Sequence, residues 1–345
     1  MISEPIDAVI TWVDGYDPSH QQKIIDYFLR LGIDKPKSIE PTRFNQCGEI
    51  AYCLKSISYF APWIRTIYLV TDGQTPHFVT ELQSTKPFGE RSTEVREITW
   101  DTQHDEILRE LANKIKIIDH RDIFRGYEAY LPVFNSLTIE LMLWRIEGLS
   151  EHFIYFNDDC FLLRPTKPRD FFREDKLVLR GEWKTQTEQK WYQRLRQKIV
   201  KKSPAINDHR MWQEQSAKLA GCNKRFFHLP HAPLPLKKQT FVDFFQQHPD
   251  VLLNNIRYPF RNKQQIWPIS LAQHIDIKKN RAIFDNGLKS IMINGAFHSI
   301  TKIKTRLTKA NQDKRAAFLC VQSLDETPNS VQELIINWLN THITI

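Results

Sequence analysis

A short apolar run that stops at three polar residues is the strongest constraint on the fold of this chain. The run Phe153–Phe156 is apolar or aromatic, and Asn157-Asp158-Asp159 follow it directly. Such a run is typical of a buried strand. Ligands of open α/β sheets bind beyond the carboxyl ends of the strands, and two carboxylates beside a carboxamide offer the oxygen ligands that hard divalent cations take. A simple strand-to-turn junction is the alternative, because Asn and Asp are common turn residues.

Strand patterns and helix patterns alternate before this run. The predicted strands cover residues 6–12, 66–71, 95–100 and 114–118. The predicted helices cover residues 19–31, residues 48–60, and a stretch that begins at Asn135 or Ser136 with Ile139, Leu143 and Ile146 on one face. This alternation predicts an α/β fold with a mainly parallel sheet through residue 160.

The charge and the cysteines narrow the possible partners and the compartment. The net charge of +8 favours an acidic partner, which could be nucleic acid, an anionic membrane face or a phosphorylated substrate. We find no zinc-finger, RNA-recognition or P-loop motif, and we expect no nucleic-acid partner. The five cysteines lack CxxC spacing, which favours a reducing cytoplasm over a disulfide framework or a zinc site. The sequence shows neither a signal-peptide pattern nor an apolar run long enough to span a bilayer.

Three positions in the first half carry polar groups where a ligand could reach them. Asp7 lies inside a predicted strand, where a carboxylate is costly unless it contacts a ligand or bonds to backbone. The tripeptide Asp72-Gly73-Gln74 follows the next strand, and Gly73 suits a tight turn or a close backbone approach. Glu140 lies in the first turn of the helix expected from Asn135, where it reaches the pocket or complements the helix dipole.

The alternation of strand and helix patterns becomes less regular after Pro165, where predicted helices dominate. Residues 184–202 predict a basic amphipathic helix, which rests on an anionic membrane or polymer, or packs on the body as a solvated helix. The sequence also predicts a helix near 264–279, two short strands near 281–293, and a final helix from Ser330.

Two basic side chains of this half suit phosphate chemistry. His231 lies between Pro230 and Ala232-Pro233, so its backbone is rigid, and its imidazole is a base, a phosphate contact or a structural group. Arg261 carries a guanidinium that suits bidentate phosphate contacts.

These blocks, in this order, resemble the Stealth family of sugar-1-phosphate transferases. That family includes bacterial capsular polysaccharide phosphotransferases and the animal enzyme that adds N-acetylglucosamine-1-phosphate to lysosomal glycoproteins. The matching blocks are Ile6–Gly15, Arg43–Phe44, Glu49–Ile57, Phe60–Gln74, Leu131–Ser136, Glu140, Arg145–Ser150, Phe153–Asp159, Pro230–Pro233, Arg261 and, in part, Phe318–Val321. The chain departs from the family pattern at Gln46, Ala51, Gln265 and Gln322-Ser323.

The resemblance implies a fold and a domain organisation. We expect a Rossmann-like, glycosyltransferase-A-like core with a mainly parallel sheet flanked by helices, and a mostly helical C-terminal half. Residues 1–345 would form a single catalytic unit. Within it we expect a nucleotide-sugar-binding core over 1–165, a basic helical insertion over 166–225, and a part over 226–345 that completes the active site.

The resemblance also implies a reaction, the transfer of hexose-1-phosphate or N-acetylhexosamine-1-phosphate from a nucleotide-diphosphate sugar to a glycan hydroxyl. The product would be a phosphodiester in a capsular polysaccharide or exopolysaccharide. The alternative is a metal-dependent glycosyltransferase that releases nucleoside diphosphate, and a third reading is a non-catalytic glycan or nucleic-acid-binding protein. The expected partners are the sugar donor, a polysaccharide or oligosaccharide acceptor, and the inner membrane or capsule assembly machinery as a peripheral contact of a cytoplasmic protein.

The same resemblance implies roles for single residues. Asp158 and Asp159 would hold Mg²⁺ or Mn²⁺, Arg261 would steady the transferring phosphoryl group, and His231 would be the general base. Asp159 and Glu140 complete the expected catalytic set. The expected substrate-binding residues are Asp7, Asp72, Gly73, Gln74, Asn135 and Asn157.

Overall fold

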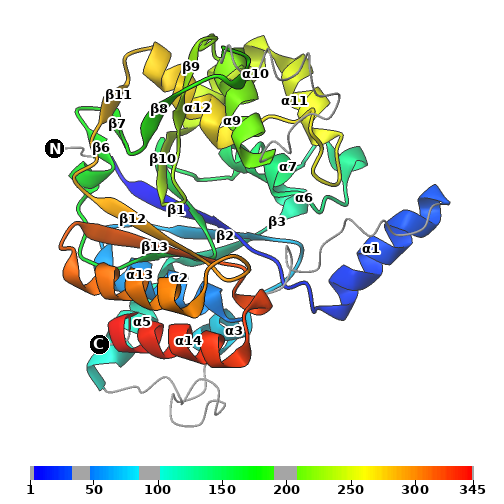
Figure 1. Cartoon of the computed structure of the whole chain (residues 1–345). Coiled ribbons are helices and arrows are strands. Elements are labelled where there is room, and N and C mark those ends of the chain that lie inside the picture. Colours follow the sequence, from blue (N-terminus) through cyan, green and yellow to red (C-terminus); the bar gives the residue numbers. More distant parts are fainter. Residues whose placement is uncertain (1–3, 33–46, 85–101, 190–207, 344–345) are drawn as a thin grey trace.

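A five-stranded sheet forms the centre of the computed structural model, which describes residues 4–32, 47–84, 102–189 and 208–343 (Figure 1). The strand order is β10-β4-β1-β2-β3. The strands are β1 (Ile6–Thr11), β2 (Ile67–Thr71), β3 (Ile115–Asp119), β4 (His152–Asn157) and β10 (Leu234–Lys237). Strands β1 to β4 run parallel and β10 runs antiparallel to β4, which confirms the predicted α/β fold with a mainly parallel sheet.

The direction of the chain across this sheet reverses at β1. From β1 the chain moves outward through β2 and β3, and it then returns to place β4 on the other side of β1. The carboxyl ends of β1 and β4 lie side by side, because Thr11 is the register partner of Asn157. Such a switch point is where open α/β sheets bind ligands.

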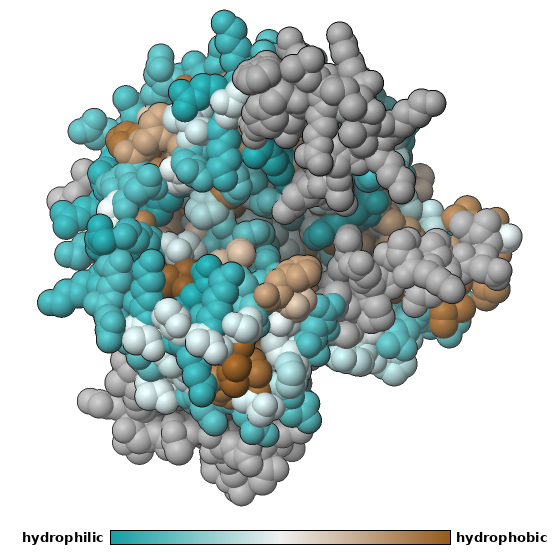
Figure 2. Space-filling model, viewed as in Figure 1, coloured by the Kyte–Doolittle hydropathy of each residue, from teal (hydrophilic) through white to brown (hydrophobic). Residues whose placement is uncertain are grey.

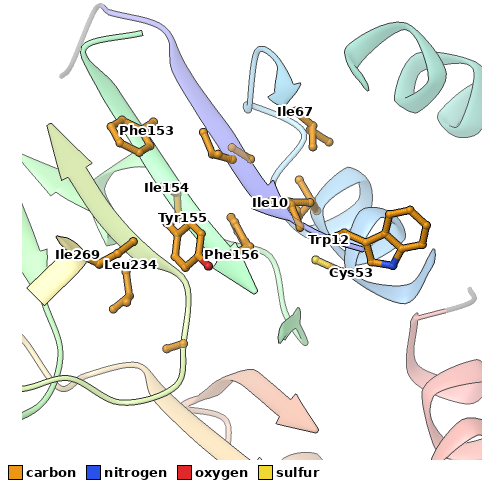
Figure 3. Close-up of a cluster of buried hydrophobic side chains, with 14 of the residues drawn as sticks. Ile10, Trp12, Cys53, Ile67, Phe153, Ile154, Tyr155, Phe156, Leu234 and Ile269 are labelled. Atoms are coloured by element: carbon orange, nitrogen blue, oxygen red, sulfur yellow. The ribbon is translucent and has the colours of Figure 1, made fainter. Parts of the chain in front are cut away.

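The central strands are apolar on both faces because helices cover both faces. Phe153, Ile154 and Phe156 of β4 have no exposed surface, and neither has Ile10 of β1. Figure 3 shows these side chains beside Leu234 of β10. Burial of one such side chain contributes about 1.5–3 kcal/mol, so this layer anchors the strand ends that carry the polar residues.

The first helix of the N-terminal half starts and stops where the sequence supplies caps. The side chain of Asp17 accepts hydrogen bonds from the backbone N–H groups of Ser19 and His20, and Gly32 ends the helix in the left-handed region. The helices of this half are α1 (Pro18–Leu31), α2 (Glu49–Phe60), α3 (His77–Gln83), α5 (Thr102–Lys114), α6 (His120–Ile123) and α7 (Ser136–Glu140). Short 3₁₀ turns are η3 (Glu128–Tyr130), η4 (Leu143–Arg145), η5 (Pro168–Asp170), η6 (Thr187–Gln189) and η7 (Leu324–Glu326).

Helix α7 is shorter than the sequence predicted. Asn135 caps it as expected, with its Oδ1 accepting from the N–H of Leu137 at 3.1 Å, but the helix ends at Glu140 instead of continuing to Ile146. The guanidinium of Arg145 donates to the carbonyls of Ile123 and Arg125. These tertiary bonds accompany the 3₁₀ turn η4, so packing overrides the helical spacing of the apolar residues.

The C-terminal half is predominantly helical, as expected, and it adds strands that the sequence only partly indicated. Its helices are α9 (Asp208–Leu219), α10 (Lys238–Gln247), α11 (Pro249–Ile256), α12 (Pro268–Lys278), α13 (Ile300–Gln312) and α14 (Asn329–Ile343). One small sheet joins β12 (Lys289–Asn294), β13 (Ala316–Gln322) and β5 (Cys160–Leu162). Others join β11 (Ala282–Phe284), β7 (Lys176–Leu179) and β6 (Phe172–Arg173), and β8 (Glu182–Thr185) with β9 (Arg225–His228).

Two predicted elements fall largely outside the described residues. These are the strand at 95–100 and the greater part of the basic helix at 184–202. The helix does not begin at 184, because that residue belongs to β8 and η6 follows it. The division at residues 165 and 225 stays a prediction, although β10 of the later part pairs with β4 of the earlier part in one sheet.

The described surface in the view of Figure 2 is largely hydrophilic, with an apolar patch on α1, the helix that extends outward in Figure 1. Ile25, Leu29 and Leu31 on this helix are 46%, 71% and 52% exposed. On the same helix, Phe28 is buried and packs against the ring of Phe260, at a centroid distance of 5.2 Å. Among the described helices, none combines the length and the apolar character that crossing a bilayer requires.

Candidate active site

A cavity of about 710 Å³ opens at the carboxyl ends of β1 and β4, where the strand order reverses. The end of β1 contributes Trp12, and the end of β4 contributes the Asn157–Asp159 cluster. The C-terminal half closes the other side with the β9–β10 connection, the segment before α12 and the end of β13. The cavity therefore lies between the two halves of the chain.

Seven of the predicted site residues line this cavity. They are Asn135, Glu140, Asn157, Asp158, Asp159, His231 and Arg261. The two catalytic residues predicted from the C-terminal half thus meet the acidic cluster that follows β4.

The acidic floor of the cavity is electrostatically crowded. Asp158 and Asp159 are partly exposed to the cavity, while protein surrounds them on the other sides. Burial raises the pKa of the Asp158 carboxyl well above its ordinary value, and the charges of Asp159 and Glu49 raise it further. Burial also raises the pKa of Asp159 to about 6. Adjacent carboxylates repel one another, and a bound cation removes that repulsion.

Glu49 is a member of this floor that the sequence prediction missed. It begins α2, lines the cavity and is 8% exposed. Burial raises its pKa to about 6; the hydrogen bond from the Cys47 N–H opposes this shift, and the charges of Asp159 and Asp325 add to it. Its place in a first helical turn suggested only a dipole-complementing role, whereas the turn points at the same sheet edge as the ends of β1 and β4.

The floor suits a hard divalent cation. Asp158, Asp159 and Glu49 supply carboxylate oxygens, and Asn157 adds an amide oxygen, which are the donor types that Mg²⁺ and Mn²⁺ take. Burial is the first cause of the raised pKa of all three carboxyl groups, and neighbouring carboxylates raise the pKa values of Asp158 and Glu49 further. The donor types present fit the predicted magnesium site.

Glu140 is held by an indole and a phenol at the wall of the cavity. Trp267 donates from Nε1 to Glu140 Oε2 at 2.7 Å, and the Tyr155 hydroxyl lies 3.2 Å from Oε1. The same hydroxyl lies 3.0 Å from Asn157 Oδ1, so it links Glu140 to the floor. Burial raises the pKa of Glu140 to about 7, against the opposing charge of Arg261 and the bond from Trp267.

His231 stands in a packed row of rings. Its ring stacks on that of His209 at 4.9 Å, and His209 in turn packs on Trp267 at 4.7 Å. The Gln322 side-chain amide lies 3.2 Å from His231 Nδ1. Burial lowers the pKa of His231, and the charge of His228 lowers it further, so the imidazole is neutral near neutral pH.

The orientation of His209 follows from a buried amide. Gln213 accepts from the N–H of Leu229 through Oε1 at 2.9 Å, so its Nε2 faces His209 Nδ1 at 3.1 Å and donates to it. His209 Nδ1 is then an acceptor, and the ring carries its proton on Nε2. Burial lowers the pKa of His209 to about 3, and the charge of His231 contributes. No motif marks His209 in the sequence, which is why the prediction missed it.

Arg261 lines the same cavity as the acidic floor. Its guanidinium donates to Ser136 Oγ at 2.7 Å and lies over the Trp212 ring at 5.8 Å. The segment that carries it is fixed by Gln265, which is fully buried and accepts from the N–H of Asn262 at 2.9 Å. Gln265, a departure from the family pattern, thus supports the loop and does not line the cavity.

Asp7 does not line the cavity, and its role in the nucleotide pocket stays a prediction. It is fully buried, and Arg65 bonds to both of its carboxylate oxygens, at 2.9 and 2.6 Å. The N–H of Ser150 donates to Oδ2 at 2.8 Å. Asp7 precedes the carboxyl end of β1 by four residues, and its partners account for its burial.

Asp72, Gly73 and Gln74, in the turn after β2, do not line the cavity either, and their substrate contacts stay a prediction. Asp72 bonds to His20 Nδ1 at 2.9 Å, and His20 itself lines the cavity. Gly73 has φ of +71°, and a Cβ there would lie 3.1 Å from Asp119 Oδ2, so the turn requires glycine. Gln74 holds both backbone groups of Asp14.

Several further lining residues that the prediction missed are aromatic or basic. They include Trp12, His20, Phe28, His120, Phe134, Trp212, Phe260 and Lys263. Scattered aromatic residues of this kind give no sequence signal, because the same residue types fill ordinary cores.

Comparison with known proteins identifies the family to which this chain is similar. Residues 4–28 match the profile of Stealth protein conserved region 1, and residues 81–179 match that of Stealth protein conserved region 2. The exopolysaccharide phosphotransferase SCO2592 of Streptomyces coelicolor is 32% identical over 279 residues, which are 79% of this chain and 25% of that protein. The chain belongs to the Stealth family.

Other relatives, named as capsular polysaccharide phosphotransferases, match about half of the chain. The capsular polysaccharide phosphotransferases fcs1 of Haemophilus influenzae and LcbA of Aeromonas hydrophila are both 36% identical, over 50% and 51% of this chain. The matched parts make up 39% and 41% of those proteins. This Stealth chain thus spans about a quarter to two fifths of the length of these relatives.

The two Stealth profiles cover only part of the site. Conserved region 2 includes Glu140 and the Asn157–Asp159 cluster, whereas His231 and Arg261 lie outside both matched ranges.

Among solved structures, the galactosyltransferase LgtC covers 98% of the chain and 97% of its own length at 10% identity, with a TM-score of 0.43. Mouse xyloside xylosyltransferase 1 covers 92% of the chain and 97% of its own length at 10% identity, with a TM-score of 0.38. The sheet described above, and not these likenesses, defines the fold.

Proposed function

We propose that this chain transfers a sugar-1-phosphate from a nucleotide-diphosphate sugar to a hydroxyl of a glycan, as a phosphotransferase of capsule or exopolysaccharide synthesis. One observation carries the proposal: Asp158, Asp159, His231 and Arg261 meet in one cavity although more than a hundred residues separate the first from the last. The names of the Stealth relatives support the same reaction class.

In this reaction the acceptor oxygen forms a bond to the phosphorus that carries the sugar, and the phosphoanhydride bond breaks. The anomeric C–O bond stays intact, and nucleoside monophosphate leaves with the former bridging oxygen. Phosphoryl transfer asks a protein mainly for positioning and for stabilisation of charge. A cavity with an acidic floor and a guanidinium supplies both.

The acidic floor would hold the divalent cation through Asp158, Asp159 and Glu49, with Asn157 beside them. When bound, Mg²⁺ or Mn²⁺ offsets the negative charge of the diphosphate. Arg261 and Lys263 line the same cavity and would contact the phosphate oxygens of the donor.

His231 would take the proton of the acceptor hydroxyl. Its lowered pKa keeps the ring neutral and able to accept a proton. Gln322 lies against Nδ1, so Nε2 is the ring nitrogen that serves the acceptor. Glu140, whose pKa is about 7, would orient a sugar hydroxyl of the donor or acceptor.

The test is the identity of the released nucleotide. The purified chain is incubated with Mg²⁺, a panel of nucleotide sugars and capsule oligosaccharides, and the products are followed by chromatography and phosphorus NMR. Nucleoside monophosphate together with a new phosphodiester supports the proposal. Nucleoside diphosphate with a phosphate-free glycosidic product would instead identify a metal-dependent glycosyltransferase and overturn it.

A further inference from the structure

A pair of buried cysteines lies directly behind the acidic floor. Cys160 opens β5, and its register partner on the antiparallel strand β13 is Cys320. Neither residue has any exposed surface, and both thiols are free. Side chains opposite each other in an antiparallel pair have Cβ atoms about 4.5–5.5 Å apart, so the two sulfur atoms share one space.

Asp159 joins this pair from the cavity side. Its Oδ1 lies 3.5 Å from Cys160 Sγ, and its carbonyl accepts from the N–H of Val321, which fixes it against β13. One ligand atom from each of Asp159, Cys160 and Cys320 lies within 4.8 Å of the other two. Tetrahedral Zn²⁺ with Zn–S bonds of about 2.3 Å requires ligand atoms about 3.8 Å apart. Side-chain rotation covers that difference.

We propose that Asp159, Cys160 and Cys320 form a site for a thiophilic divalent cation of the Zn²⁺ and Cd²⁺ class. Two of the three ligand atoms are sulfur, which soft and borderline cations prefer and which Mg²⁺ does not use. The fourth position of a tetrahedral site would face the cavity, since Asp159 and Val321 line it.

Binding requires that each thiol lose its proton. The balanced step is M²⁺ plus two thiols giving one metal dithiolate and two protons, with the Asp159 carboxylate as third ligand. Because binding releases these protons, we expect the site to bind more tightly as pH rises.

The site has a consequence for the proposed reaction, on which this one step of the inference rests. Asp159 would serve both the hard cation on the cavity side and the soft cation behind it. A soft cation that takes Asp159 removes a ligand from the magnesium site, so Zn²⁺ would act as an inhibitor that excess Mg²⁺ relieves poorly.

Cd²⁺ binding to the full chain tests the site without donor, acceptor or turnover. The chain is reduced with a phosphine and titrated with Cd²⁺, whose thiolate complexes absorb in the ultraviolet by charge transfer. We expect a band that saturates at one Cd²⁺ per chain, disappears on addition of Zn²⁺, and is accompanied by proton release. An absent band in the wild-type chain would overturn the proposal.

Cysteine variants locate the ligands. Cys160→Ala and Cys320→Ala should each weaken Cd²⁺ binding by more than about 100-fold, because even an outer-shell partner is worth about 10–100-fold in metal affinity. Cys222→Ser is the matched control, since Cys222 is half-buried after α9 and away from β5 and β13, and it should retain the full band.

Folding and the shared ligand are checked separately. Circular dichroism shows whether each alanine variant is folded, and Asp159→Asn gives a second variant that keeps both thiols and still lowers the affinity. An unchanged band in either folded alanine variant, or loss of the band in Cys222→Ser, would contradict the assignment. Because this readout needs no catalysis, its failure is distinguishable from failure of the proposed function.

Discussion

His209 stacks on His231 with ring centroids 4.9 Å apart and planes inclined by 25°. His209 is itself fixed by Gln213 on one nitrogen and by packing against Trp267. The candidate base therefore rests on a neutral imidazole that burial keeps uncharged. The neutral His209 ring places no second positive charge beside His231. Gln213 and Trp267 set the orientation of the His209 ring.

We predict that His209→Ala lowers kcat by about 100-fold with little change in donor KM, since misplacement of a reacting group by about 1 Å has an effect of that size. His209→Phe retains an aromatic ring against His231 and should keep most of the activity. Steady-state kinetics of both variants give the answer. Equal losses in the two variants would mean that stacking is not what positions His231.

His231→Ala should lower kcat by about 10²–10⁴-fold, the range of general base catalysis, while donor affinity stays close to that of the wild-type chain. His228→Asn is the matched control, because His228 lies three residues earlier, bonds to the Leu229 carbonyl and does not line the cavity. Single-turnover rates and donor binding by calorimetry separate the two effects. Unchanged turnover in His231→Ala would remove this residue from the mechanism.

The Trp267→Phe variant tests in which protonation state Glu140 acts, through the pH dependence of activity. The indole N–H stabilises the charged carboxylate, so its loss should raise the Glu140 pKa above about 7. If ionised Glu140 orients the sugar, activity falls as pH drops through that pKa, and the acid limb of kcat/KM moves up by about one to two pH units. An acid limb that stays in place would argue that Glu140 acts in its neutral form.

The cation-free protein should lose stability as pH rises. Burial raises the pKa values of Glu49 and Asp159 to about 6, so folding favours their protonated forms. That stabilisation is complete below the ordinary carboxyl pKa near 4 and is lost as pH passes through about 6; for Glu49 alone it is worth about 2 kcal/mol.

Thermal unfolding with and without Mg²⁺ measures this effect. Mg²⁺ competes with protons for the carboxylates of the acidic floor. It should therefore raise the unfolding midpoint more at about pH 8 than at about pH 5. Asp158→Asn should raise the cation-free midpoint at the higher pH and abolish most of the Mg²⁺ increment. An equal Mg²⁺ effect at both pH values would count against a cation site on these carboxylates.

Arg65→Ala should destabilise the fold without touching the chemistry. The substitution leaves the fully buried Asp7 without its charged partner, which costs roughly 3–5 kcal/mol. Chemical unfolding measures the loss, and donor KM well below the unfolding midpoint should be unchanged. A marked rise in donor KM would support the sequence prediction that Asp7 belongs to the nucleotide pocket.

The sequence was most informative where chemistry and local structure coincide. The strand ending at Asn157 was predictable because its apolar run stops at polar residues, and the topology of a parallel sheet then places Asp158 and Asp159 at the ligand edge. His231 and Arg261 were predictable as residues that suit phosphate chemistry, and the family resemblance placed them in one site.

Other features depend on tertiary packing that no local pattern reports. The short α7 ends at Glu140 because Arg145 finds carbonyl partners elsewhere. Asp7 reads from sequence as a ligand contact or a bonded strand residue, and only the structure shows its bonds to Arg65. His209 and Glu49 carry no distinctive spacing, so their roles emerge only when α9 and α2 are placed around the sheet.

The order of the cavity residues along the chain determines when the cavity can be completed during synthesis. Gln322, which lies against the candidate base, comes from β13, whereas the acidic floor follows β4. A nascent chain that has folded its central sheet as far as β4 still lacks His231, Arg261 and Gln322. The ribosome must therefore deliver the chain through β13 before this cavity is complete.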